Sequence, residues 1–159
     1  MTVGLALASG RPLLGDTNFR CANVALLNFE HGLDGLQWRQ EEAMRHHEIK
    51  PGSTKGRFCP FDAFDGWVTA VPTKVGRVVY PQETAVRQQI DWYGIDVLMI
   101  DAFAEGHEAA DDSDREMFKA TVAWRRIARS ENCAIVLVHA LSGASRQSSS
   151  LRLEGPIGL

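Results

Sequence analysis

The chain has no long apolar run and little cysteine. No stretch approaches the roughly 20 apolar residues that a membrane-spanning helix needs, so no membrane association is expected. The only cysteines are Cys21, Cys59 and Cys133, which are widely spaced and include no C-x-x-C pair. An odd number of such cysteines, without a signal peptide, predicts free thiols and a reducing, cytoplasmic location. Their spacing from the histidines matches no usual zinc-finger pattern.

Positive charge is not in excess either. The net charge is −3 at pH 7, so the chain has no overall attraction to nucleic acid or to an anionic membrane surface. Hydrophobic residues make up 45% of the 159 residues, and charged residues make up 23%. That length and that balance are typical of one soluble globular domain with a proper core.

Several catalytic motifs are absent. The chain contains no G-x-S-x-G nucleophile elbow and no G-x-x-x-x-G-K-[ST] phosphate-binding loop. Residues 51–56, PGSTKG, include glycines and a lysine, but in a different order and without a preceding strand. The acidic segment 105–114 lacks the ligand spacing of a calcium-binding loop, so a solvated acidic loop is the better interpretation.

Two apolar runs each end in a polar residue. Residues 95–100 lead into Asp101, and residues 134–138 lead into His139. Between them, residues 114–130 have the apolar spacing of a helix. A strand, a crossover helix and a second strand form the right-handed unit of a parallel sheet. The sequence therefore predicts an α/β fold in which helices flank a mainly parallel sheet.

The rest of the chain fits this architecture. Residues 24–29 have the character of another buried strand, and Glu30 follows it. Further helices are expected at 2–9, ended by Gly10, at 35–48, capped by Asp34, and at 83–93, ended by Gly94. The stretch 57–80 is ambiguous and shows only short strand-like pieces. Residues 141–159 are expected to form a flexible serine-rich loop and a C-terminal tail.

Each polar residue that follows a strand has two interpretations. Asp101 can hold magnesium, as such an aspartate does in phosphate-transfer enzymes, or it can cap the loop after its strand. Glu30 can polarise an attacking water, or it can be an exposed glutamate at a strand end. His139 can donate a hydrogen bond to a phosphate, or it can bond to loop backbone. In the functional interpretation all three converge at one edge of the sheet.

Taken in order, these pieces resemble the middle of a RecA-like P-loop ATPase. They are most similar to the RepA-like plasmid helicase and AAA-type ATPase family. The resemblance covers about residues 4–140, and four segments carry it: 5–15, 24–30, 95–117 and 127–139. The third segment looks like a Walker B strand with its acidic loop, and the fourth looks like the helix and sensor strand that lead to a histidine.

The resemblance implies ATP and magnesium as cofactors. Asp101 would then bind the magnesium, Glu30 would activate water, and His139 would be the phosphate sensor. The implied partners are further copies in a ring-shaped homo-oligomer or a related ATPase subunit, together with single-stranded DNA. The implied process is DNA replication or plasmid and phage maintenance. In the segment after His139, where related proteins contact DNA, only Arg146 and Arg152 offer positive charge.

The same resemblance marks two missing parts. The phosphate loop of the family would lie just before Met1, and further strands would follow Leu159. Residues 1–140 are therefore expected to be a partial RecA-like core, truncated at both ends. Without the phosphate loop, the chain is expected to be inactive alone. The alternative is a non-enzymatic α/β domain that binds a partner and uses its strand-end polar residues structurally.

Overall fold

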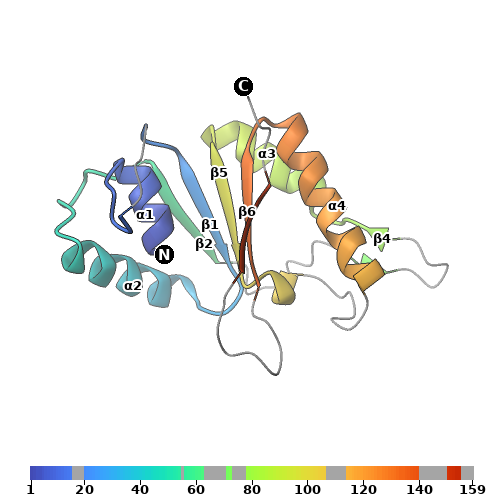
Figure 1. The fold of residues 1–159 in the computed structure, drawn as a ribbon, viewed down its shortest axis with the longest axis horizontal. Helices are drawn as coiled ribbons and strands as arrows, with labels where there is room; N and C mark the ends of the chain where they lie inside the picture. The colour runs from blue at the N-terminus through green and yellow to red at the C-terminus, as the bar shows by residue number, and fades with distance from the viewer. Residues whose placement is uncertain are drawn as a thin grey trace.

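The computed structural model describes residues 1–15, 20–54, 56–62, 71–72, 78–106, 114–139 and 150–154. Within these residues a five-stranded sheet has helices on both faces (Figure 1). The helices are α1 (Thr2–Ser9), α2 (Leu33–His46), α3 (Glu83–Tyr93) and α4 (Asp114–Ser130), with a short 3-10 turn at Phe103–Gly106. α1 and α2 cover one face, and α3 and α4 cover the other.

The sheet is mainly parallel, which confirms the predicted fold class. Its strands are β1 (Val24–Asn28), β2 (Phe58–Asp62), β5 (Val97–Asp101), β6 (Ala134–His139) and β7 (Ser150–Glu154). Their order is β2-β1-β5-β6-β7, with β7 antiparallel to β6 and all other pairs parallel. The short strands β3 (Val71–Pro72) and β4 (Val78–Val79) form a separate antiparallel pair.

The C-terminal part contains a strand that the sequence pattern did not indicate. β7 lies within residues 141–159, for which a flexible loop and a tail are expected. The serine-rich residues 140–149 and most of the acidic segment, residues 107–113, lie outside the described residues. In the described part of the chain, no helix combines the length and the apolar character needed to cross a membrane.

Helix boundaries follow the sequence signals except at the start of α2. Gly10 and Gly94 end α1 and α3 with φ values of 69° and 57°, the left-handed conformation that glycine adopts at least cost. The expectation that Asp34 caps α2 is wrong, because the helix begins at Leu33 after Gly32 and Asp34 lies inside its first turn. A carboxylate in that turn is still favourable, since it faces the positive end of the helix dipole.

Two apolar layers hold the helices to the sheet. On one face, α1 and α2 contribute Leu5 and Leu36 to a layer with Leu26 and Met99. The other layer packs side chains of α3 and α4 against the opposite side of the same strands. Residues in β1 alternate between the two layers, and this explains why the central strands are almost continuously apolar.

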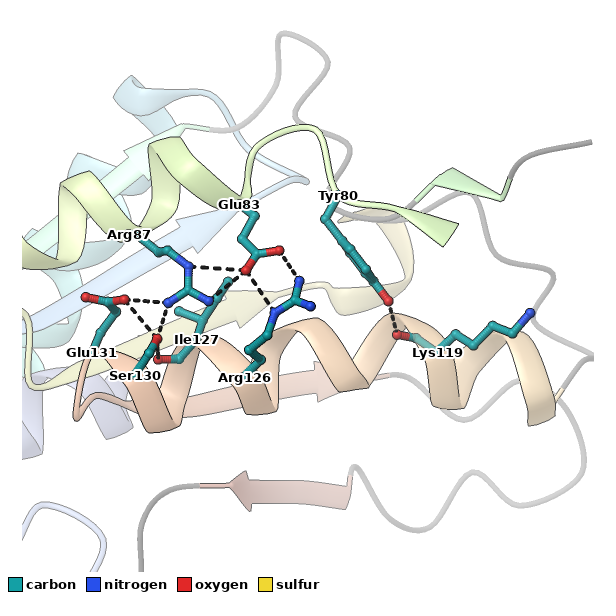
Figure 2. Close-up of polar contacts among 8 residues, drawn as sticks. All are labelled: Tyr80, Glu83, Arg87, Lys119, Arg126, Ile127, Ser130 and Glu131. Carbon is teal, nitrogen blue, oxygen red and sulfur yellow. Dashed lines mark hydrogen bonds and ion pairs between the residues drawn. The ribbon is translucent and has the colours of Figure 1, made fainter. Parts of the chain in front are cut away.

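A charged network ties α3 to α4 (Figure 2). Glu83 accepts hydrogen bonds from Arg87 at 2.7 Å, one turn along α3, and from Arg126 Nε of α4 at 3.0 Å. Arg87 also pairs with Glu131, just after α4. Burial raises the pKa of Glu83, but hydrogen bonds and charges of both arginines outweigh it, so the pKa lies below its ordinary value. The hydrogen bond from Arg87 likewise lowers the pKa of Glu131.

The Glu83→Gln substitution is expected to lower the free energy of unfolding at pH 7 by about 1–2 kcal/mol, because charge-assisted hydrogen bonds are lost. A depressed folded-state pKa stabilises the fold above the unfolded-state pKa, and that stabilisation disappears as the pH falls through the folded-state pKa. Urea unfolding between about pH 7 and pH 3 should therefore show a smaller loss of stability in the variant than in the unchanged chain.

A matched control is Glu42→Gln, which removes an ion pair between Glu42 and Arg45. The Glu42 side chain is 46% exposed and the Arg45 side chain is 70% exposed. Such exposed pairs contribute less than about 1 kcal/mol. Equal effects of the two substitutions at pH 7 would show that the α3–α4 network adds nothing beyond an ordinary surface pair.

Candidate functional site

The carboxyl ends of the parallel strands meet at one edge of the sheet, which is the lower edge in Figure 1. In the strand register, Asn28 of β1 pairs with Asp62 of β2 on one side and with Asp101 of β5 on the other. Leu137 pairs with Ile100, so His139 lies one position further toward this edge than Asp101. Side chains alternate along a strand, so Asn28 and Asp101 belong to the α1–α2 face and His139 to the opposite face.

The start of α1 packs on the face of β5 to which Asp101 belongs, since Leu5 and Met99 share one apolar layer and Met99 lies two residues before Asp101. Burial lowers the pKa of the Met1 amino group, the negative charge of Asp101 raises it, and the positive charge of Arg39 in α2 lowers it. These three groups are therefore close enough to interact electrostatically. α1 also directs the positive end of its dipole to this place, and within the described residues no side-chain hydrogen bond caps it.

Glu30 lies in the turn that joins β1 to α2. Its backbone N–H and that of His31 both donate to Oδ1 of Asn28, at 3.1 and 2.8 Å. The Glu30 carboxylate is half exposed, and its Oε2 lies 3.8 Å from Nδ1 of His31. The adjacent Phe29 N–H donates to the carbonyl of Asp101 at 2.8 Å, so this turn is joined to the end of β5.

His139 ends β6 on the face covered by α4. Its ring lies edge-on to Phe103, with 6.3 Å between the ring centroids. Its Nδ1 is buried, and no hydrogen-bond partner for it exists among the described residues.

The structure brings the three sequence-predicted residues to one edge but does not join them directly. Among the described residues, no hydrogen bond or ion pair links Glu30, Asp101 and His139 to each other. The register also separates Asp101 from His139 by the thickness of the sheet. Sequence reasoning missed Asn28 and Arg39. Asn28 carries a readable signal, a polar residue at the end of an apolar run, whereas the place of Arg39 depends on how α2 packs.

Within the described residues, no group of three or more histidine, cysteine, aspartate or glutamate side chains could hold a metal ion. A zinc or calcium cage is therefore not built from this part of the chain. Magnesium differs, since it keeps several waters and commonly takes one or two carboxylates together with phosphate oxygens. Asp101, on the face of β5 that α1 covers, provides a carboxylate of that type.

A comparison with protein families decides the assignment. The family model described as an AAA domain matches residues 1–143. The chain belongs to the AAA domain family. Members of this family have an ATPase-like domain, and membership indicates nucleotide binding in general. The parallel sheet with helices on both faces is consistent with a RecA-like core of this AAA domain. No curated protein sequence matches the chain.

Proposed function

We propose that this AAA domain binds ATP with magnesium at the carboxyl edge of its sheet, as part of a RecA-like, RepA-type helicase that serves DNA replication or plasmid and phage maintenance. One observation carries the proposal: Asp101 ends a central parallel strand, and α1 packs on the same face of that strand, where a Cβ atom on Gly4 would lie 3.3 Å from the sulfur of Met99, two residues before Asp101. Ligands of α/β sheets bind at this edge, and helix N-termini favour phosphate.

The roles of the residues follow from their places. Asp101 would bind magnesium, directly or through water, and the first backbone amides of α1 would face the phosphates. The bound magnesium would neutralise charge that develops on the phosphates. Glu30 is half exposed at the same edge, where it would take a proton from an attacking water. His139 would donate a hydrogen bond to a phosphate group from the opposite face of the sheet.

Hydrolysis by residues 1–159 alone is expected to be negligible. The sequence contains no G-x-x-x-x-G-K-[ST] loop, whose lysine and amides stabilise the transferred phosphate. Each such electrostatic contribution lowers the barrier by about 3–4 kcal/mol, so losing it costs about 100- to 1,000-fold in rate. Further copies in a ring, or a related ATPase subunit, would complete the enzyme, and single-stranded DNA would be its substrate.

Binding of ATP with Mn²⁺, a paramagnetic substitute for Mg²⁺, tests the proposal on the unchanged chain. Amide signals of Ala102, Glu30 and Val3 should broaden in NMR spectra, whereas those of Asn23 and Gly94, at the amino edge, should not. A phosphate-release assay on the same sample should show no turnover above background. Broadening spread evenly over both edges would contradict the proposed site, and magnesium-dependent turnover would contradict the predicted inactivity.

A second candidate function is that of a non-enzymatic domain that binds a partner protein. A cavity of about 280 Å³ opens between α3 and strands β1, β2 and β5, and its walls are mainly apolar, with Phe61 and Tyr93 among them. Trp92, next to Tyr93, is 83% exposed. Exposed apolar surface of this kind is typical of interaction sites. A chain that stays monomeric and binds ATP with Mn²⁺ would favour the ATP-binding function over the partner-binding function.

A further inference from the structure

Asn28 is a buried polar residue in an apolar strand. It ends β1, and only 4% of its surface is exposed. The preceding residues on the same face, Val24 and Leu26, belong to the apolar layer under α1 and α2. A buried amide is unfavourable unless it is hydrogen-bonded, so the contacts of this side chain explain why the strand tolerates it.

The side chain of Asn28 holds the backbone of the following turn. Its Oδ1 accepts the N–H of Glu30 at 3.1 Å and the N–H of His31 at 2.8 Å. Such bonds from an asparagine to the backbone two and three residues later bend the chain sharply. The turn therefore begins at the last residue of β1, and the carboxamide of Asn28 helps to set the direction in which Glu30 leaves the sheet.

The same residue connects this turn to Asp101. Asn28 and Asp101 are register partners on neighbouring strands, and the Phe29 N–H donates to the Asp101 carbonyl at 2.8 Å. Asp62 stands on the other side of Asn28 in the register.

We propose that Asn28 is a positioning residue, which sets where Glu30 lies relative to the metal site at Asp101. The inference rests on the proposed function, because Glu30 and Asp101 act together only if ATP and magnesium bind at this edge. It adds a role for a residue to which the proposed function assigns no contact with the nucleotide or the metal. Asn28 acts through the backbone of Glu30 and His31.

The first measurement is amide hydrogen exchange by NMR on the full chain without ligand. In Asn28→Ala, the amides of Glu30 and His31 should exchange faster on the order of tenfold, the amount that one lost hydrogen bond allows. Asn28→Asp keeps an oxygen acceptor and should retain the protection. The matched control is Asn23→Ala, which removes a side-chain bond to Gly94 at the other end of β1 and should leave both amides unchanged.

The second measurement adds ATP with Mn²⁺ to the same variants. In Asn28→Ala the amide of Ala102 should still broaden, whereas the broadening of the Glu30 amide should fall at least about twofold as the turn moves away. Asn28→Asp should restore it. If Asn28 only stabilised the fold, Asn28→Ala would lower the melting temperature but would not change the ratio of the broadening at Glu30 to the broadening at Ala102.

Three outcomes decide between the two proposals. Unchanged exchange at Glu30 and His31 in a folded Asn28→Ala chain would overturn the positioning role. An unchanged ratio of broadening would overturn its connection to the metal site. If the Ala102 signal does not broaden even in the unchanged chain, the proposed function fails. The exchange rates still show whether Asn28 holds the backbone amides of Glu30 and His31. Should Asn28→Ala unfold, Asn28→Ser replaces it, since a hydroxyl can accept one of the two bonds and should leave the other amide unprotected.

Discussion

The Asp101→Asn substitution is expected to weaken magnesium-dependent ATP binding by about 10- to 100-fold, because a carboxylate that faces a cation contributes about 1.5–3 kcal/mol. ATP binding without magnesium should change much less. Isothermal titration with and without magnesium measures both. The same substitution should lower the pKa of the Met1 amino group, since the negative charge of Asp101 raises that pKa. An amine-reactive reagent at graded pH reports this shift and tests the geometry without any ligand.

The matched control is Asp96→Asn. Asp96 directly precedes β5, whereas Asp101 is the last residue of that strand. Asp96 accepts the Asn23 N–H at 2.8 Å and pairs with Arg20 at 3.6 Å, at the amino edge of the sheet. Its loss should affect stability but not the magnesium dependence. Equal loss of binding in both variants would mean that Asp101 acts only through the fold. A Met1 pKa that does not respond to Asp101→Asn would contradict the placement of α1.

The Gly4→Ala substitution is expected to lower the free energy of unfolding by about 2–3 kcal/mol, the upper range for adding a methyl group to a packed core. A Cβ atom built on Gly4 would lie 2.5 Å from Cε2 of Phe58 and 3.3 Å from the sulfur of Met99. The aromatic ring is itself buried against the sheet, so α1 would have to move outward. Urea unfolding followed by circular dichroism measures the loss.

Gly35→Ala provides the comparison for this prediction. Gly35 lies in α2, and a Cβ atom there would meet only the Cβ of His31, at an ordinary 3.7 Å. Alanine is a better helix former than glycine by about 1 kcal/mol, so this substitution should be neutral or stabilising. A stabilising effect at Gly4 as well would show that α1 does not pack as closely on Phe58 as the structure describes. Displaced α1 should also weaken ATP binding in Gly4→Ala, because that helix packs on the face of β5 to which Asp101 belongs.

Much of the local structure could be predicted from particular residues. Gly10 and Gly94 ended helices where expected, because only a residue without Cβ takes their left-handed conformation at little cost. The bounds of α3 and α4 followed from apolar spacing and helix propensity. The start of α2 could not be predicted in this way. Asp34 is a good capping residue, but Asn28 already bonds the backbone of the turn before it, and the helix begins at Leu33.

The candidate site was predictable only in outline. An apolar run that ends in a carboxylate indicated Asp101. The buried strand over residues 24–29 indicated Glu30, because the carboxyl ends of strands in a parallel sheet share one edge. Asn28 belonged to the same pattern, yet its hydrogen bonds depend on the path of the turn. Met1 and Asp101 interact electrostatically although they lie far apart in the sequence, and no local sequence signal predicts such an interaction.

The sequence by itself determined the α/β class, the apolar strands, most of the helices and three of the polar residues near the strand ends, namely Glu30, Asp101 and His139. Each depends on the chemistry of near neighbours: burial on both faces, helical spacing and the conformational freedom of glycine. Only the tertiary structure decided how these residues meet. The register of β1 on β5 places Asn28 beside Asp101, and packing of α1 on Met99 brings the Met1 amino group close enough for the charge of Asp101 to act on it. A shift of one residue reverses the face on which a strand side chain lies, which is why His139 follows an apparently equivalent strand but belongs to the opposite side of the sheet.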